Sequence, residues 1–511
     1  MPTGRDPETE RDGLRDPSQL YFQADHVRRT IIAAYWIIIF LAVPLWWHTT
    51  SIERLPLPSA LVESQAEREL QFPIRLQVPE SHAVILPRLQ GLLREKTLGH
   101  PERWKGLDLQ LSVSGSAPTE TEAYKLSHRL GESLIDKRQF IHDLSIEQMP
   151  ELSALLCDLL APPPTHGNLV FQYSPRYRLA FSLLNEDSAS GGYVRTWNIT
   201  AGISRHISPI LSRMSVLHNF TLESQVQFHA PLAFEPRSIP DGEYGLSQED
   251  LTVFVNSAEW TLSSSVSNDA VIHFVIFAPS AKRRPLRILG SDGAPLSSNS
   301  FLLPQWGGIY ILNAPSSMES SRDLSSVDLD SIFPTFSEQL ITLLGIPRLP
   351  SSVQVRHANA RNVISEWQLD ALMRRRTLEN THGSQDTLRS IVRLVDQIEN
   401  MPFGASVRGD IQNSLAALEK AYAEASTSLS HALTSSAEAL TMASRAFFDP
   451  GMLALLYFPA EHKYAVYMPL FASAVVPLIA TALREFMAWK RQRRGIAGGQ
   501  APPIEAAPAR G

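Results

Sequence analysis

The apolar residues of this sequence gather in two long runs, one near each end of the chain. Residues 31–47 contain no charged side chain and would reach about 26 Å as a helix. Residues 464–483 are also uncharged and would reach about 30 Å, which matches the hydrocarbon core of a bilayer. Both runs are apolar on every face. The sequence therefore predicts two transmembrane helices, over 28–50 and 464–484, rather than two buried helices of a soluble core.

The basic residues around these runs predict their orientation. Eight arginines and lysines lie within seventeen residues of the two outer ends, whereas only Arg54 and Lys463 lie as close to the inner ends. Because cytoplasmic flanks carry the excess of basic residues, both termini are expected in the cytoplasm. The first run is preceded by thirty residues and followed by no convincing cleavage site, so we expect an uncleaved signal anchor. The 416 residues from His48 to Lys463 would then be lumenal.

Two N-glycosylation sequons lie in this predicted lumenal segment. Asn198 and Asn219 each begin an Asn-x-Thr triplet, and neither tail of the chain contains one. Sequons act as glycan acceptors in segments that enter the secretory pathway. Their placement agrees with the orientation indicated by the basic residues, and we expect both asparagines as N-glycosylation sites.

Strand and helix patterns alternate over 51–165. Apolar residues fill every second position of 72–78 and 107–113, which is typical of half-buried strands, and 82–97 between them suits a helix. A helix at 145–160 would end at three prolines. A further helix is expected to open at a capping box of Thr119 and Glu122 and to carry one apolar face, consisting of Leu126, Leu130 and Leu134. This order predicts a βαβα layer with a parallel or mixed sheet.

Strands dominate the next predicted unit, 166–350. Its expected strands are apolar, β-branched or aromatic runs, at 169–173, 178–184, 251–255, 270–277 and 309–312. The first two flank a short Ser-Pro-Arg-Tyr connection, which favours a hairpin. Helices are expected at 201–216 and at 331–344, where Gly345 and Pro347 would end the second. Trp306-Gly307-Gly308 predicts a bulge or tight bend before the last strand.

The region 351–447 is predicted to be helical. One apolar face runs from Leu388 to Ile398, and a second stripe, beginning at Leu415, predicts one helix of about 40 residues. Such a helix needs a partner surface, either its own domain or another subunit, and we favour its own domain. A pre-membrane segment at 448–463 follows. The tail 1–27 is expected to be disordered, and 485–511 to be basic and then disordered.

Composition and motifs limit the kinds of ligand and reactive site that the chain is expected to have. The net charge of −6 over 511 residues gives no basic surplus for nucleic acid, and the single cysteine excludes an intramolecular disulfide or a cysteine metal cluster. That cysteine, Cys157, lies among leucines of the 145–160 helix and is expected to be a small buried hydrophobe. His273 is expected as a satisfied core histidine. Arg374–Arg376 is expected on a solvated helix face, with a partner contact as the alternative.

No catalytic, cofactor or metal motif stands out in the sequence. It contains no His-Glu-x-x-His, phosphate-binding glycine loop, dinucleotide fingerprint or nucleophile elbow. We therefore expect no catalytic residue, no cofactor and no metal site. A large lumenal body without such motifs favours an assembly or recognition subunit over an enzyme.

Four strings in order resemble one family. VPLWWHTTSIERLPLP (43–58) and AFFDPGMLALLYFPAEHKYAVYMPLF (446–471) resemble the terminal signatures of the phosphatidylinositol-glycan class S (PIG-S) family, and LLPQWGGIYILN (302–313) and LLGIPRLP (343–350) are similar to two of its internal landmarks. The resemblance runs from 31 to 490. It implies a two-span endoplasmic-reticulum subunit of the glycosylphosphatidylinositol (GPI) transamidase, with two transmembrane helices flanking a large mixed α/β lumenal domain whose C-terminal third is helical.

The resemblance also implies partners. The complex removes the C-terminal signal of a precursor and joins the new carboxyl end to the ethanolamine of a GPI lipid. Its thiolate chemistry belongs to a separate caspase-like subunit, PIG-K, whose catalytic dyad has no counterpart here. The other implied partners are PIG-T, PIG-U, a GAA-type subunit and membrane lipid, with GPI itself among the candidates. Two alternatives stay open: a two-span cargo receptor, and a lumenal hydrolase or transferase whose site carries no recognisable motif.

Overall fold

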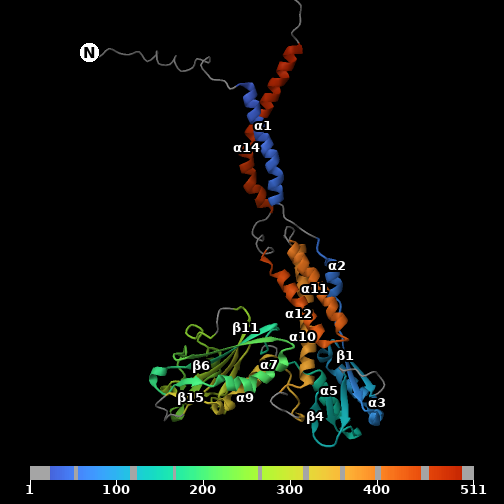
Figure 1. Cartoon of the computed structure of the whole chain (residues 1–511), viewed down its shortest axis with the longest axis vertical. Coiled ribbons are helices and arrows are strands. Elements are labelled where there is room, and N and C mark those ends of the chain that lie inside the picture. Colours follow the sequence, from blue (N-terminus) through green and yellow to red (C-terminus); the bar gives the residue numbers. More distant parts are fainter. Residues whose placement is uncertain are drawn as a thin grey trace, which may run out of the picture. The chain divides into compact units, whose positions relative to one another are not determined.

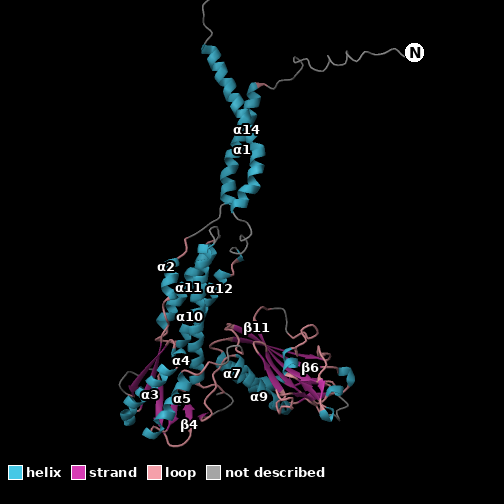
Figure 2. Ribbon diagram, turned by 180° about the vertical axis from the view of Figure 1, so that it is seen from behind, coloured by secondary structure: helices cyan, strands magenta, loops and turns pink. Residues whose placement is uncertain are grey.

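A computed structural model describes residues 24–50, 56–114, 123–164, 169–262, 267–314, 321–356, 363–397, 404–450 and 460–497. The chain divides into two compact units. One contains the two terminal helices, and the other contains Pro58–Arg393 and Gly409–Phe447. Figure 1 follows the chain through both units, and Figure 2 shows its helices and strands.

The first unit contains the two apolar helices, α1 (Asp25–Thr50) and α14 (Ala460–Ala497). Their segments His26–Thr49 and Ala465–Arg491 are each long and apolar enough to cross a membrane, and neither is buried inside the protein. The sequence prediction of two long apolar helices near the ends of the chain is therefore confirmed. Pro44, Pro469 and Pro477 lie inside these helices without ending them.

The two apolar helices contact each other in antiparallel order. Near the end of α1, the Trp46 ring lies 5.8 Å from that of Tyr467 and 5.3 Å from that of Phe471, both in the first half of α14. At the other end, the Arg29 Nε lies 3.2 Å from Glu485 Oε2, and Arg28 also pairs with Glu485. The start of α1 therefore lies beside the second half of α14.

The second unit begins with a mixed six-stranded sheet, in the order β16-β4-β5-β3-β1-β2. Its strands are β1 (Phe72–Val78), β2 (Leu107–Val113), β3 (Tyr124–His128), β4 (Ser133–Asp136), β5 (Gln139–His142) and β16 (Val353–Val355). Strands β1, β2, β3 and β5 are parallel, and β4 runs antiparallel to β5. The 3-10 turn η2 (Glu80–Ile85) leads to α3 (Leu86–Gly99), which packs with α5 (Met149–Leu160) on this sheet, while α4 (Pro101–Trp104) precedes β2. The predicted strands 72–78 and 107–113 and the helices 82–97 and 145–160 are confirmed.

The predicted helix carrying Leu126, Leu130 and Leu134 is wrong. Leu126 lies in β3 and Leu134 in β4, and Leu130 is exposed in the turn between these strands. Burial alternates along each strand, so the four-residue spacing arises from two short strands on either side of a turn rather than from one helical face. The capping box of Thr119 and Glu122 lies outside the described residues.

A second, five-stranded sheet follows in the order β13-β14-β11-β6-β8. Its strands are β6 (Arg176–Asn185), β8 (Asn219–Gln227), β11 (Ala270–Ala278), β13 (Ser300–Leu303) and β14 (Gly307–Ile311). Only β13 runs antiparallel to its neighbour. Two smaller sheets accompany it, with strands β7 (Val194–Trp197), β9 (Arg237–Ser238), β10 (Tyr244–Leu246), β12 (Leu286–Ile288) and β15 (Arg322–Leu324).

Helices cover one face of this sheet. The 201–216 prediction corresponds to α6 (Ile199–Gly202), a π-helical turn (Ile203–Ile207) and α7 (Ser208–Met214). The 331–344 prediction corresponds to α9 (Ser326–Leu343), which begins five residues earlier at a capping box of Ser325 and Asp328. Gly345, with φ of +74°, follows its end. Side chains of α7 and α9 pack on β6 and β11 in one apolar core.

The strand predictions here are partly wrong. Strands β6, β11 and β14 confirm 178–184, 270–277 and 309–312, but 169–173 is not a strand and forms no hairpin, because β6 pairs in parallel with β8 and β11. The 251–255 run is the end of α8 (Gln248–Thr252) followed by a loop. Its Phe254 is buried against Trp260 and Phe277, so tertiary burial rather than a strand accounts for these apolar residues.

The last part of the second unit is helical. It consists of α10 (Glu366–Gln397) up to Arg393, α11 (Ala405–Glu424) from Gly409 and α12 (Leu429–Phe447), with α2 (Ser59–Ala66) packed beside α11. The single 40-residue helix is therefore wrong: the chain turns at 425–428, where Ser426, Thr427 and Ser428 offer the backbone alternative hydrogen bonds.

The three long helices pack on one another. The Ser414 hydroxyl of α11 donates to the Ala439 carbonyl of α12 (2.8 Å), and the Asn380 amide of α10 donates to the Ser436 hydroxyl of α12 (3.3 Å). Leu433 of α12 belongs to the core under the second sheet. The prediction that this apolar stripe packs on its own domain is confirmed.

Candidate functional site

The predicted solvated run Arg374–Arg376 lies on α10, and the prediction of a solvated face is wrong. Arg374 and Arg376 are each only 5% exposed. Arg374 donates to the Leu160 carbonyl at the end of α5 (3.1 Å) and to the Tyr124 hydroxyl of β3 (2.9 Å). Arg376 donates to the carbonyls of Phe171 (3.0 Å) and Leu344 (3.3 Å). Arg374 and Arg376 of one helix thus bind the first-sheet region and the second-sheet region respectively.

A buried carboxylate completes this network. Asp370 lies one turn before Arg374 and accepts hydrogen bonds from Arg138 Nε (2.8 Å) and Nη2 (3.0 Å) and from the Tyr124 hydroxyl (2.8 Å). Its side chain is 3% exposed. Burial raises the pKa of Tyr124 well above its ordinary value, so this phenol stays protonated and donates to Asp370. The cluster of Tyr124, Arg138, Asp370 and Arg374 is hereafter called the α10 network.

Apolar side chains of α10 also pack into the cores of both sheet regions. Trp367 is fully buried in the core of the first sheet, whereas Leu369, Leu372 and Met373 belong to the core of the second. Because these residues follow one another on one helix, α10 holds both sheet regions through a single rigid element.

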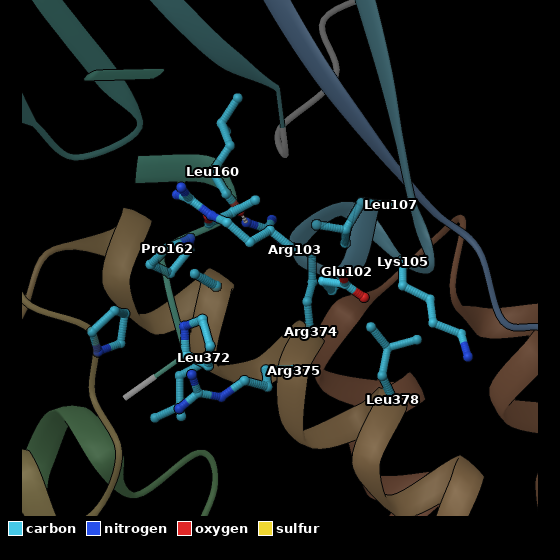
Figure 3. Close-up of a pocket in the computed structure, with 14 residues that line it drawn as sticks. Glu102, Arg103, Lys105, Leu107, Leu160, Pro162, Leu372, Arg374, Arg375 and Leu378 are labelled. Carbon is cyan, nitrogen blue, oxygen red and sulfur yellow. Dashed lines mark hydrogen bonds between the residues drawn. The ribbon is translucent and has the colours of Figure 1, made fainter. Parts of the chain in front are cut away.

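A cavity with a volume of about 200 Å³ lies beside Arg374 of the α10 network. Figure 3 shows the residues that line it. Its polar lining comes from Glu102, Arg103, Lys105, Arg374 and Arg375, and its apolar lining from leucine, alanine and proline side chains of α10, β2 and the chain after α5. These fourteen lining residues include no serine, threonine, cysteine or histidine.

The arginines around the cavity bind backbone carbonyls. Arg103 donates to the Ala161 carbonyl from Nε (2.9 Å) and Nη2 (2.6 Å), and Arg375 donates to the Gly345 carbonyl (3.2 Å). Burial lowers the pKa of Arg375. The cavity therefore lies where arginine–carbonyl hydrogen bonds connect segments of the chain, and among the described residues no hydroxyl, thiol or imidazole nucleophile lines it.

Of the residues considered for chemistry in the sequence, Arg374 and Arg375 line this cavity, whereas Cys157 and His273 do not. Cys157 is 5% exposed in α5, and burial raises the pKa of its thiol to about 11, which keeps it protonated; the prediction of a buried cysteine is confirmed. His273 is half-buried with its ring 4.7 Å from that of Trp306, and burial lowers its pKa to about 4. Its Nδ1 has no hydrogen-bond partner among the described residues, so it is not the fully satisfied histidine that was predicted. In the described part of the chain no group of three or more metal-ligating side chains exists.

Both predicted sequon asparagines are exposed. Asn198 lies between β7 and α6, and Asn219 begins β8, an edge strand. Thr200 and Thr221 of the sequons are exposed as well. The geometry leaves room for a glycan on each asparagine.

We expect Asn198→Gln and Asn219→Gln each to remove one glycan from the protein made in its own cells. The measurement is mobility on a denaturing gel before and after glycan-cleaving enzyme, with Thr200→Ala and Thr221→Ala as matched variants that destroy the sequon and keep the asparagine. Unchanged mobility in both variants of a pair would remove that asparagine from the glycosylation sites and weaken the lumenal orientation.

The α10 network was not found from sequence, although one signal for it exists. Asp370 and Arg374 are four residues apart, so on a helix they share a face. Their partners Tyr124 and Arg138 lie more than 230 residues earlier in the chain. Local spacing could therefore indicate the pair but not its burial.

An α/β body organised on one helix, and a separate pair of helices long and apolar enough to cross a membrane, define the class of protein to which this fold belongs. The chain belongs to the PIG-S family, described as phosphatidylinositol-glycan biosynthesis class S protein, whose family model matches residues 33–125 and 163–492. The resemblance stated from the sequence strings is therefore confirmed.

Curated relatives match over most of the chain. A Rattus norvegicus protein named GPI-anchor transamidase component PIGS is 29% identical over 90% of this chain and 95% of its own length. A Schizosaccharomyces pombe protein named GPI transamidase component PIG-S homolog is 28% identical over 94% of this chain and 88% of its own. The Saccharomyces cerevisiae GPI transamidase component GPI17 is 23% identical over 85% of this chain and 87% of its own.

Proposed function

We propose that this chain is a non-catalytic subunit of a GPI transamidase complex. The observation that carries the proposal is family membership across both apolar helices and most of the body, together with relatives that are named as transamidase components. The non-catalytic role is supported by the only cysteine, Cys157, whose thiol is buried and protonated.

We further propose that α1 and α14 cross the endoplasmic-reticulum membrane as an antiparallel pair. Their contacts, from Trp46 with Tyr467 and Phe471 to Arg28 and Arg29 with Glu485, bring the two outer ends to the same side. The basic residues that follow Arg484 and precede Ile31 then favour the cytoplasm for that side. The α/β body would lie in the lumen, between the two spans in sequence.

This arrangement suggests a physical role in the transamidation reaction. A body attached to the membrane by both ends has a restricted height and tilt, so it can hold partner subunits near the bilayer, where the GPI lipid and the precursor's C-terminal segment meet. The contribution would be positioning and effective concentration rather than bond chemistry. The proposed partners are a caspase-like catalytic subunit of the PIG-K type, PIG-T, PIG-U and a GAA-type subunit.

Depletion of the protein in its own cells tests this proposal. We expect uncleaved precursor of a GPI-anchored reporter to accumulate beside complete, unused GPI lipid, as followed by immunoblot and lipid labelling. Re-expression of the Cys157→Ala variant should restore anchoring as fully as the wild-type chain does, since Cys157 takes no part in the chemistry. Normal anchoring after verified depletion would overturn the transamidase role, and failure of Cys157→Ala at wild-type protein levels would overturn the non-catalytic one.

A further inference from the structure

Three loops meet at the carboxyl ends of the parallel strands in the first sheet. They are 79–85 after β1, 129–132 after β3 and 143–147 after β5. The His82 and His128 rings lie 4.7 Å apart, which joins the first loop to the end of β3. The Leu144 amide donates to His128 Nδ1 (3.1 Å), which joins the third loop to the same place.

The strand order reverses at this point. β1 leads to β2 on one side of it, whereas β3 leads to β4 and β5 on the other, and β1 and β3 are neighbours. In open α/β sheets, binding sites occur preferentially beyond the carboxyl ends of the strands where the order reverses. The His82–His128 contact lies at that reversal.

Exposed apolar side chains gather on these loops. One residue of each loop is highly exposed: Val84 by 87%, Leu130 by 74% and Ile146 by 56%. Single exposed apolar residues are ordinary on protein surfaces, but a group of them on adjoining loops marks an interaction surface. We call Val84, Leu130 and Ile146, with the charged residues of the same loops, the carboxyl-edge surface.

The charges of the carboxyl-edge surface are mostly negative. The three loops contain the carboxylates Glu80, Glu132, Asp143 and Glu147 and one cation, Arg129. Glu80, Glu132 and Glu147 are exposed, and Asp143 is half-buried beside His128. Loops that expose both apolar and acidic side chains are complementary to a surface that exposes both apolar and basic side chains.

We propose that the carboxyl-edge surface docks another protein subunit, one that presents apolar side chains surrounded by lysines and arginines. The exposed carboxylates of these loops disfavour two other occupants, because they would repel both anionic lipid head groups and the same acidic surface of a second copy. The inference rests on the proposed function, since a subunit of a complex needs such surfaces and the partner is then a transamidase component.

The test substitutes all three apolar residues in the full-length chain, as Val84→Glu, Leu130→Glu and Ile146→Glu. The matched control places three glutamates at exposed apolar positions elsewhere, Leu98→Glu, Val216→Glu and Val327→Glu, which are 72%, 51% and 76% exposed. Both variants should melt at the wild-type temperature, because none of the six side chains is buried. Each is expressed with an affinity tag in cells that lack the endogenous protein, and the transamidase subunits recovered with it are quantified.

We expect the surface variant to recover one transamidase subunit at least about tenfold less than the wild-type chain does, and the control to match wild type. A second variant, Glu80→Lys with Glu132→Lys and Glu147→Lys, should weaken the same subunit's recovery and reverse its dependence on salt. Equal recovery by wild type and both surface variants would overturn the inference alone. A wild-type chain that recovers no transamidase subunit would instead overturn the proposed function. In that case native particle size tests the docking surface by itself: the inference is wrong if the surface variant and the wild-type chain migrate as particles of equal size.

Discussion

Asp370→Ala is expected to destabilise the α/β body by about 3–5 kcal/mol, the range typical for removing one partner of a buried ion pair. The substitution leaves Arg138 without its carboxylate and the Tyr124 hydroxyl without an acceptor, next to Arg374, which is only 5% exposed. Asp370 is 3% exposed and the Arg138 side chain is 27% exposed, so water reaches the arginine of the pair and the loss falls at the lower end of this range. The α10 helix would therefore lose one of its connections to the first sheet, while Trp367 and the Arg374–Leu160 hydrogen bond remain.

Thermal unfolding of the purified full-length chain in detergent checks this prediction. A loss of this size should lower the midpoint by an amount on the order of 5–10 °C. Asp386→Ala is the matched control, because Asp386 lies on the same helix with its side chain 56% exposed and pairs with the exposed His382. Exposed pairs contribute little, so the control should melt within about 1–2 °C of wild type. An Asp370→Ala midpoint equal to that of the control would show that the α10 network does not stabilise the packing of α10 on the first sheet.

The elements predicted correctly from sequence are those whose pattern is local. Strands β1 and β2 alternate over seven residues each, and the two terminal helices are uniformly apolar over a bilayer's width. Burial along β1 alternates as its sequence does. In such segments one face or the whole surface is apolar, so the pattern alone identifies the element.

The errors arose where distant partners decide the outcome. Arg374 and Arg376 are buried because the carbonyls of Leu160, Phe171 and Leu344 accept their hydrogen bonds, and these carbonyls lie 32 to 214 residues away in sequence. A run of three arginines is ordinarily solvated, and only the assembled fold supplies acceptors that compensate for desolvation. For the same reason, the spacing of Asp370 and Arg374 could indicate where the candidate site lies in the sequence. It could not indicate that this site connects α10 to distant parts of the fold.

The prediction for the connection between β13 and β14 was correct about the bend but did not give the full reason for its two glycines. The sequence Trp306-Gly307-Gly308 predicted a tight bend or bulge, and the structure has a hairpin turn there with Gly307 at φ of +153°. The reason for two glycines is steric as well as conformational. A Cβ on Gly307 would lie 1.9 Å from the His273 carbonyl oxygen of β11, and a Cβ on Gly308 would lie 1.9 Å from the Gln339 side chain of α9.

Gly307→Ala is therefore expected to destabilise the second sheet by about 3 kcal/mol or more, because the methyl group collides with the backbone of a central strand, which cannot rotate away. Gly131→Ala is the matched control: Gly131 also has a positive φ, +115°, but a Cβ there meets nothing within 4 Å. The control thus retains the conformational strain and lacks the collision. Thermal unfolding of both full-length variants should place Gly307→Ala well below Gly131→Ala. Equal midpoints would mean that backbone strain alone, and not the close approach of β14 to β11, explains the glycine.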